Sequence, residues 1–246
     1  AAYCPKCNTK LKYEFYHYGH LGEYECPNCD FKRGKVDFKA SDVDLKNSVF
    51  KINGIEFKLN KGMFFAVYYT LLAYSLAKLV GLSIEQIKKS INDDMMPSKR
   101  GKTFYLNGRP VEMLESKNEN ALSYLQSLNY IKNKDGKKTV ILGFENVSRR
   151  YNFNDLSWLW DVDFELLKDD NIDKIFCIGR FKYDVAVRLD YADIDRNKVV
   201  LVDDIKTLID RVNQESSGDI YTMVCFDMTE MITNMLREWN NEKEGN

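Results

Sequence analysis

Four cysteines near the start of the chain constrain its folding more than any other feature. They form two Cys-x-x-Cys pairs, Cys4/Cys7 and Cys26/Cys29, and eighteen residues separate the pairs. This spacing is typical of a four-thiolate zinc ribbon, in which each pair forms a tight knuckle and the ion sits in a closed tetrahedron. A segment this small has little core, and metal binding can supply about 10–16 kcal/mol of folding free energy. We therefore predict that residues 3–33 form a zinc ribbon whose Zn²⁺ is structural.

A nucleic-acid role is the functional alternative for this ribbon. Residues 1–39 carry seven Lys and Arg against five Asp and Glu, and the whole chain has a net charge of −1. This balance gives no basic field for a phosphate backbone, so we expect no nucleic-acid partner. The chain's two histidines, His17 and His20, lie between the cysteine pairs. Because four thiolates already satisfy one zinc ion, we predict that both are hairpin residues and not ligands.

The remaining sequence is typical of a globular α/β protein. The most apolar stretch, residues 63–82, is interrupted by Lys78, which predicts a buried helix and no transmembrane segment. Cys177 and Cys225 lie inside apolar, strand-like runs, which predicts buried thiols. This cysteine usage favours a reducing cytoplasm over a disulfide framework. The chain starts without Met, and we expect it to be part of a longer protein.

Residues 34–97 are predicted to form a hairpin followed by two helices. The pair Asn53-Gly54 between two alternating runs is a strong hairpin signal. A helix is expected from Gly62 to about Val80. A second helix should begin after Ser83, with Gln86 at the capping-box position. The segment DDMMPSKRG then breaks the pattern, and we place a domain boundary there, between residues 1–97 and residues 98–246.

In residues 98–246, a hairpin at Asn107-Gly108 precedes a regular alternation of strands and helices. The expected strands are 137–144, 172–179, 199–204 and 219–226, and the expected helices are 118–131, 182–192, 205–214 and 229–240. Such alternation with continuously apolar strands predicts a parallel, doubly wound sheet. Functional sites in these sheets lie at the carboxyl ends of the strands.

This second domain contains no histidine, which argues against a self-contained Ser-His-Asp or Cys-His centre. A Gly-x4-Gly-Lys-Ser/Thr phosphate loop is also absent from the sequence. The segment NFNDLSWLWDVDFE, residues 152–165, places Asp155 after a strand, where a site is expected. The structural alternative is a capped amphipathic turn with both of its tryptophans in the core.

The segment GRFKYDVAVRLDYADID, residues 179–195, is a second candidate. Arg180 should lie at a strand end, near the N-terminus of a helix. The structural alternative is a surface helix in which Val185, Val187 and Leu189 support the core.

Three ordered segments together resemble the MurT family. These are the ribbon YGHLGEYECPNCDFKR, the stretch NDLSWLWDVDFE and the stretch GRFKYDVAVRLDYADID. MurT proteins are the synthetase-like subunits of lipid II isoglutaminyl synthase and are similar to Mur ligases. The resemblance implies part of a Mur ligase central domain carrying a zinc ribbon in residues 1–97. A C-terminal Rossmann-like α/β domain would follow in residues 98–246.

The resemblance also implies an activity and its partners. A GatD-like glutaminase subunit would release ammonia from glutamine. The MurT-like subunit would use ATP and Mg²⁺ to convert the D-glutamate of lipid II to D-isoglutamine in peptidoglycan synthesis. The expected location is cytoplasmic, with peripheral contact at the inner membrane face, where lipid II lies.

The resemblance assigns roles to individual residues. An aspartate of the family's C-terminal domain completes the Cys-His pair of the glutaminase, and Asp155 occupies that motif position. Arg100, Lys117, Asn118 and Arg180 are the implied nucleotide-binding or substrate-binding residues.

Several segments depart from the family pattern. The phosphate loop of the family lies upstream of the ribbon, so this chain alone is predicted to be inactive. The helix start reads FFAVYYT, the stretch SKNENAL lacks the family's Pro and Gly, and Asn152-Phe153 replaces Asp-Gly. These departures favour an alternative in which the chain is a non-catalytic zinc-ribbon scaffold or regulatory subunit on a degenerate Mur ligase fold.

Overall fold

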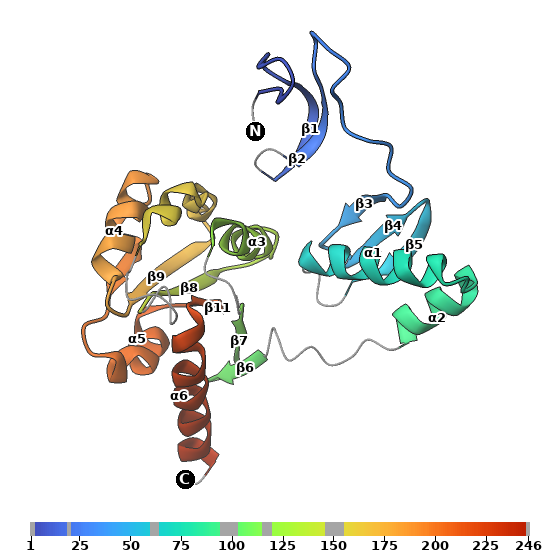
Figure 1. The fold of residues 1–246 in the computed structure, drawn as a ribbon. Coiled ribbons are helices and arrows are strands. Elements are labelled where there is room, and N and C mark those ends of the chain that lie inside the picture. Colours follow the sequence, from blue (N-terminus) through green and yellow to red (C-terminus); the bar gives the residue numbers. More distant parts are fainter. Residues whose placement is uncertain are drawn as a thin grey trace. The chain divides into compact units, whose positions relative to one another are not determined.

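The chain divides into two compact units, Ala1–Lys39 and Ala40–Asn246 (Figure 1). The computed structural model describes residues 3–18, 21–59, 64–93, 103–114, 120–145 and 155–244. The predicted boundary at residue 97 lies outside the described residues and stays a prediction. Among the described residues, no helix is long and apolar enough to cross a membrane.

The first unit is a small antiparallel hairpin beside the cysteines. Strand β1 (Lys12–Tyr18) pairs with β2 (Leu21–Glu25). Among the side chains that the structure describes, its apolar cluster contains four cysteines, one leucine and three aromatic rings: Cys4, Cys7, Leu11, Tyr13, Tyr24, Cys26, Cys29 and Phe31. So small a cluster gives the hairpin little hydrophobic stabilisation of its own.

The second unit begins with a three-stranded antiparallel sheet. It consists of β3 (Ala40–Asp44), β4 (Val49–Ile52) and β5 (Ile55–Lys58). The turn between β4 and β5 is Asn53-Gly54, with φ of 48° and 83°. Two consecutive positive φ angles define the tight hairpin turn that this dipeptide favours, so the predicted hairpin is confirmed.

Two helices follow, α1 (Phe64–Leu79) and α2 (Ile84–Asp93). The Ser83 amide donates to Gln86 Oε1 at 2.9 Å, and the Gln86 amide donates to Ser83 Oγ at 3.2 Å. These reciprocal bonds satisfy two amides that the helix start leaves without partners. The predicted capping box is therefore confirmed.

A six-stranded sheet forms the centre of the second domain. Its order is β10-β9-β8-β11-β7-β6. The strands are β6 (Thr103–Leu106), β7 (Arg109–Met113), β8 (Lys138–Gly143), β9 (Ile172–Ile178), β10 (Val199–Leu201) and β11 (Asp219–Val224). Five strands are parallel, and β6 is antiparallel to β7 because the Asn107-Gly108 turn joins them. The predicted mixed α/β fold with a parallel sheet is confirmed.

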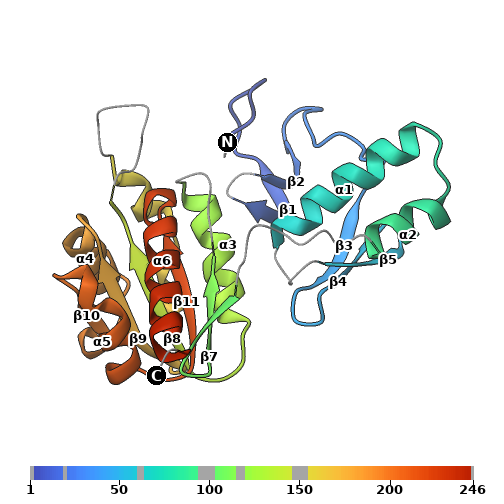
Figure 2. The same ribbon diagram turned by 90° about the horizontal axis from the view of Figure 1, so that it is seen from below.

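Helices cover both faces of this sheet, as Figures 1 and 2 show. The helices are α3 (Ala121–Lys132), α4 (Lys182–Tyr191), α5 (Leu208–Glu215) and α6 (Phe226–Glu244). Four 3₁₀ helices join them: η1 (Ser157–Asp161), η2 (Phe164–Leu167), η3 (Arg196–Lys198) and η4 (Ile205–Thr207).

Alternate side chains of each central strand enter two separate cores. In β9, Ile175 and Cys177 pack with α3 and α4, whereas Phe176 and Ile178 pack with α5 and α6. The two-residue period of a strand puts neighbours on opposite faces. Both faces of the sheet are therefore buried, as expected for a doubly wound fold.

Helix α3 begins later than predicted. Asn120 is extended, and its side chain accepts the Ser123 amide at 3.0 Å, so the helix starts at Ala121. At the other end of the helix, the buried Lys138 of β8 donates to the Lys134 carbonyl at 2.8 Å and to Asp169 at 3.0 Å. A cation at a helix C-terminus interacts favourably with the helix dipole, which ties α3 to the sheet.

The strand order places a switch point next to β8. The chain runs outward from β8 to β9 and β10, and then returns to add β11 on the other side of β8. The connections leaving β8 and β11 therefore diverge, and a crevice opens at the carboxyl ends of these strands.

Candidate functional site

The four cysteines of the first unit lie together. Their Sγ atoms are all within 4.8 Å of one another. Cys4 Sγ is 3.5 Å from Cys29 Sγ, and Cys7 Sγ is 3.4 Å from Cys26 Sγ. A disulfide would be about 2.0 Å long, so these are free thiols. Four sulfurs about 2.3 Å from one zinc ion would be separated by roughly 3.8 Å, so this arrangement fits a tetrahedral metal site.

Two similar turns present these sulfurs. The Lys6 amide points to Cys4 Sγ and the Asn28 amide points to Cys26 Sγ, each at 3.4 Å. Each amide lies two residues after the first cysteine of its pair. An N–H group directed at sulfur stabilises the thiolate, which is the form that binds metal.

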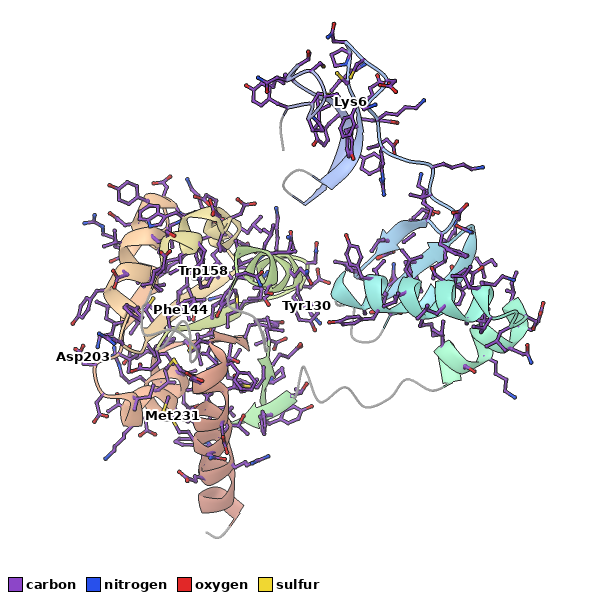
Figure 3. All side chains as sticks on the ribbon, viewed as in Figure 1. Lys6, Tyr130, Phe144, Trp158, Asp203 and Met231 are labelled. Carbon is purple, nitrogen blue, oxygen red and sulfur yellow. The ribbon has the colours of Figure 1, made fainter. Side chains whose placement is uncertain are left out.

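Further contacts support the same arrangement. Cys7 Sγ lies 3.3 Å from Thr9 Oγ1. Lys6, labelled in Figure 3, pairs with Asp30 at 2.9 Å and joins the two turns. The side chains of His17 and His20 lie outside the described residues, so their predicted role is untested.

The second candidate region is the crevice at the carboxyl edge of the parallel sheet. It is a cavity of about 570 Å³ beside the ends of β8, β9 and β10 and the start of α6. Asp203 and Met231, labelled in Figure 3, are on its wall. Its charged residues are Glu145, Arg180, Lys182, Asp203, Asp204 and Asp227. Four carboxylates against two cations make this crevice net negative.

Gly179 determines how the crevice is built. Its φ is +84°, and a Cβ atom there would lie 2.6 Å from the Phe144 carbonyl oxygen. Only glycine tolerates both conditions. The turn directs the Arg180 amide to Glu145 Oε2 at 2.9 Å. Arg180 is thus at a strand end next to α4, as predicted, with its side chain exposed.

Asp155 is exposed immediately before η1. Its Oδ1 accepts the Ser157 amide at 2.8 Å. Hydrogen bonds from the backbone and side chain of Ser157 lower the pKa of Asp155. The carboxylate is therefore ionised at neutral pH and accessible to another molecule. Its catalytic role stays a prediction.

The two tryptophans after Asp155 differ in their surroundings, which corrects the expectation that both are in the core. Trp158 packs against Phe144 and Tyr124, with ring centroids 6.0 and 5.1 Å away (Figure 3). Trp160, in contrast, is 53% exposed. The alternating tryptophans of SWLW thus differ in burial, with Trp158 packed on the core and Trp160 exposed.

In helix α4, too, the residues expected in the core differ in burial. Val185 and Leu189 are buried as expected, but Val187 is exposed. The buried Arg188 donates to the Val162 carbonyl at 2.7 Å and lies 3.0 Å from the Glu165 carboxylate. Sequence reasoning missed Arg188, although an arginine between buried positions of a helix is a signal for a buried ion pair.

Three predicted site residues, Arg100, Lys117 and Asn118, lie outside the described residues. Glu145 and Asp203 were not predicted, although each lies two residues after the end of a strand. Cys177 and Cys225 are buried, as predicted, and burial raises the pKa of Cys177 to about 12. Such thiols are unreactive.

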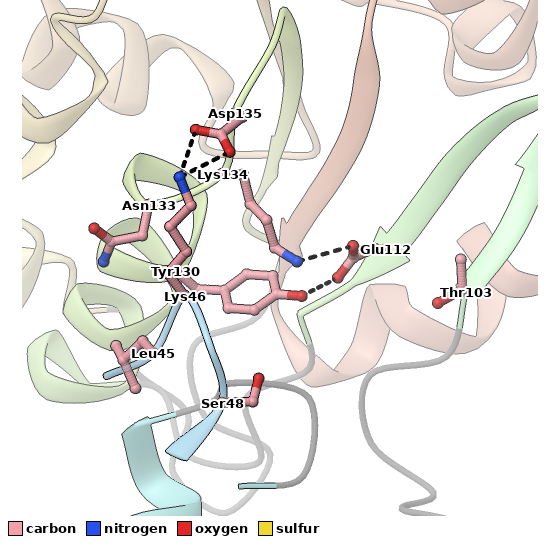
Figure 4. A pocket seen from close by; sticks show the side chains of 9 residues that line it. All are labelled: Leu45, Lys46, Ser48, Thr103, Glu112, Tyr130, Asn133, Lys134 and Asp135. Carbon is pink, nitrogen blue, oxygen red and sulfur yellow. Dashed lines mark hydrogen bonds and ion pairs between the residues drawn. The ribbon is translucent and has the colours of Figure 1, made fainter. Parts of the chain in front are cut away.

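A second pocket, shown in Figure 4, includes a buried tyrosine–carboxylate pair. Tyr130 donates to Glu112 at 2.5 Å, and Lys134 is 3.7 Å from the same carboxylate. Burial, then the hydrogen bond to Glu112, raises the pKa of Tyr130. This arrangement keeps the phenol protonated, which suits a structural hydrogen bond between α3 and β7.

Comparisons with known proteins find relatives that include the six-stranded sheet domain. Residues 117–229 match the family model described as MurT ligase C-terminal. The MurT subunit of lipid II isoglutaminyl synthase (glutamine-hydrolyzing) from Staphylococcus aureus is 25% identical over 194 residues, which cover 78% of this chain and 43% of that protein. The corresponding subunit from Streptococcus pneumoniae is 25% identical over 231 residues, covering 91% and 50%. The chain thus spans about half the length of these curated relatives.

Solved structures show the same fold. A pseudomurein peptide ligase type C from Methanothermus fervidus superposes with a TM-score of 0.68 at 20% identity, over 96% of this chain and 48% of that chain. MurF from Acinetobacter baumannii gives a TM-score of 0.61 at 16% identity, over 82% and 45%. Residues 117–229 thus match the MurT ligase C-terminal family, and the chain shares the fold of these ligases.

Proposed function

We propose that the chain is a MurT-like subunit of an ATP- and glutamine-dependent amidotransferase that converts the D-glutamate of lipid II to D-isoglutamine. The match of residues 117–229 to the MurT ligase C-terminal family carries this proposal. Lipid II at the membrane surface is the proposed substrate, and a GatD-like glutaminase is the proposed partner. Since the chain spans about half of its relatives, the proposal concerns the complete complex.

The chemistry of Asp155 supports a need for a partner. Residues 40–246 contain no histidine, so an aspartate here has no imidazole of its own domain to orient. Its exposed, ionised carboxylate can accept a hydrogen bond from the histidine of another chain. In a Cys-His-Asp arrangement, the carboxylate orients the imidazole and stabilises its charged form.

The cysteine cluster is proposed to hold one structural Zn²⁺. All four positions of a tetrahedron would be filled by Cys4, Cys7, Cys26 and Cys29, which leaves no open position for a substrate or water. The spacing of the sulfurs and the two N–H groups directed at them support this assignment. The ion would stabilise the fold of residues 3–33.

The crevice fits a nucleotide poorly. Its four carboxylates outnumber its two cations, Arg180 and Lys182, and would repel a triphosphate. The crevice therefore offers no favourable site for the phosphates of ATP, and Arg180 is proposed as a substrate-binding residue only. Arg100, Lys117 and Asn118 stay proposed nucleotide-binding or substrate-binding residues.

The decisive experiment is co-expression of the full-length protein with the glutaminase-type amidotransferase of the same genome. Glutamine hydrolysis and amidation of lipid II are measured by ammonia release and by mass spectrometry. We expect Asp155→Asn to reduce glutamine hydrolysis by at least about 100-fold, because the histidine loses its orienting carboxylate. Asp170→Asn, at an exposed aspartate before β9, is the matched control and should leave the rate unchanged.

A non-catalytic scaffold is the second candidate, favoured by the altered segments FFAVYYT and SKNENAL. It predicts a stable complex without lipid II amidation. ATP-dependent amidation by the co-expressed pair would exclude it. Unchanged glutamine hydrolysis by the Asp155→Asn complex would instead exclude the assignment of Asp155.

A further inference from the structure

Arg188 of α4 holds the segment that follows Asp155, although sixty residues of sequence lie outside that pairing's local context. Arg188 is buried, and its Nη2 donates to the Val162 carbonyl at 2.7 Å. The same nitrogen lies 3.0 Å from the carboxylate oxygens of Glu165. Val162 ends η1 and Glu165 belongs to η2. One guanidinium therefore fastens the junction of these two 3₁₀ helices to α4.

A series of backbone hydrogen bonds connects this junction to Asp155. The Val162 amide donates to the Leu159 carbonyl at 3.3 Å, and the Leu159 amide donates to the Leu156 carbonyl at 3.0 Å. Asp155, the preceding residue, accepts the Ser157 amide at 2.8 Å. Each such bond fixes a residue against the one three positions earlier, as in any 3₁₀ helix. A displacement of the Val162 carbonyl would therefore be passed along the turn to the residues that hold Asp155.

Arg188 also contacts the aromatic rings of the same segment. Its guanidinium carbon is 5.7 Å from the centroid of the Trp160 ring and 5.6 Å from that of Phe164. Both distances are within the range of a cation–π interaction. Phe164 and Leu159 are part of the core, whereas Asp155 is exposed. The exposed carboxylate is thus carried by a turn that Arg188 and the core hold from the protein side.

Stability alone accounts poorly for a buried arginine at this position. Burial of a guanidinium carries a desolvation cost, and apolar residues of similar volume often replace buried ion pairs without loss of stability. Among the described atoms, Arg188 Nε has no hydrogen-bond partner, which adds to this cost. The carboxylate of Glu165 is half exposed, so water screens its attraction to the cation. What the guanidinium adds is fixed donor geometry, because its N–H groups lie in one rigid plane.

We propose that Arg188 is a positioning residue for Asp155. This inference rests on the proposed function, in which Asp155 orients the histidine of a glutaminase. Arg188 does not touch the reacting atoms and acts only through the Val162 carbonyl and the turn that leads back to Asp155. Misplacement of a catalytic group by about 1 Å can cost roughly 100-fold in rate. Loss of Arg188 should therefore reduce glutamine hydrolysis while the sheet domain stays folded.

The test measures glutamine hydrolysis by the full-length protein co-expressed with the glutaminase-type amidotransferase of the same genome. Arg188→Met should lower kcat by about 10-fold to 100-fold and leave the KM for glutamine unchanged, because glutamine binds to the other chain. Arg196→Met is the matched control: Arg196 also pairs with an aspartate of α4 but is exposed, and its loss should not change kcat.

Circular dichroism melting shows whether each variant is folded. If Arg188→Met does not fold, Arg188→Lys replaces it in every measurement. Lysine keeps the charge without the rigid donor plane, so kcat should still fall by at least about 3-fold.

A double-mutant cycle distinguishes positioning from general damage. In a protein that already carries Asp155→Asn, Arg188→Met should change kcat by less than about 2-fold, because no carboxylate is left to position. Losses that multiply would overturn the inference. Amidation of lipid II with ammonium chloride in place of glutamine bypasses hydrolysis and should be unchanged in Arg188→Met. Its loss would indicate damage to the whole domain and would also overturn the inference.

Failure of this inference and failure of the proposed function give different results. If Asp155→Asn lowers glutamine hydrolysis but the folded Arg188 variants keep the wild-type kcat, only the role of Arg188 is overturned. If Asp155→Asn leaves hydrolysis unchanged, the proposed role of Asp155 is overturned, and the positioning role of Arg188 with it. A wild-type complex that amidates lipid II with neither glutamine nor ammonium chloride would instead contradict the proposed function itself.

Discussion

The cysteine unit and the sheet domain are stabilised in different ways. Among the described side chains of the first unit, those of Cys4, Leu11 and Cys26 are buried, with a few aromatic rings around them. The sheet domain has two extensive apolar cores, one on each face of six strands. Apolar burial can stabilise the second but not the first. One chain thus combines a unit that has four clustered cysteines and little core with a unit that depends on packing, and each should respond to different perturbations.

Removal of one cysteine should give the largest difference in stability between the two units. Cys4→Ser should abolish binding of the proposed Zn²⁺ and unfold residues 3–33, since binding supplies about 10–16 kcal/mol to such a unit. The sheet domain should keep its thermal transition. Metal content by mass spectrometry and amide NMR spectra follow the two units separately. Cys177→Ala, which removes a thiol outside the cluster, should retain one equivalent of zinc, and a Cys4→Ser protein that does the same would refute the site.

A substitution that creates a cavity in the core of the sheet domain tests whether that unit depends on packing. Leu142→Ala removes a fully buried side chain from β8 and should cost about 2–5 kcal/mol of the free energy of unfolding. Urea denaturation of the sheet domain measures this loss, with the exposed Leu122→Ala as the control. Metal content should be unchanged. If both units of Leu142→Ala unfolded together at a single lower midpoint, the two units would not be stabilised independently.

The buried Lys138 tests how much a polar interaction contributes to the stability of the packed unit. Its side chain is 1% exposed and is satisfied by Asp169 and by carbonyl groups at the end of α3. Lys138→Met leaves these acceptors without their donor and should cost about 2–3 kcal/mol in urea denaturation. The neighbouring Lys137→Met is the control: its ammonium is exposed and should contribute less than about 0.5 kcal/mol.

A fall in pH should slightly lower the stability of the sheet domain through Glu165. The hydrogen bond from Arg188 lowers the pKa of Glu165. Its contribution is therefore present above the unfolded value of about 4.3, and is lost as the pH falls through the lower folded value. Because Glu165 is half exposed, we expect only a few tenths of a kcal/mol. Thermal melts from pH 7 to 3 should show a slightly steeper acid loss in the wild type than in Glu165→Gln, and equal slopes would argue against this pair.

Local signals predicted much of the fold. The Asn-Gly turns, the capping box of Ser83 and Gln86, and the apolar runs of the parallel strands depend on neighbouring residues, and all appear as expected. The cysteine cluster was also predictable, because two short ligand pairs restrict its geometry.

Features that depend on distant segments were harder to predict. The sequence did not indicate that Trp158 enters the core while Trp160 remains exposed, because a short 3₁₀ turn lacks a regular hydrophobic period. The crevice was expected at the strand ends, but its acidic character required Glu145, Asp203 and Asp227 to be brought together from three segments. The ion pair of Arg188 likewise joins α4 to η2.

The position of β11 has a consequence for how the chain is made. This strand lies between β7 and β8, although more than one hundred residues separate it from β7 along the chain. At about 5–20 residues per second, a ribosome needs roughly 5–20 seconds to reach β11 after completing β7. Until then, the β6–β7 hairpin and the β8–β9–β10 sheet each expose an unpaired edge to other chains. The nascent protein should therefore depend on chaperones most during this interval, and truncation before β11 should leave two sheets that cannot join.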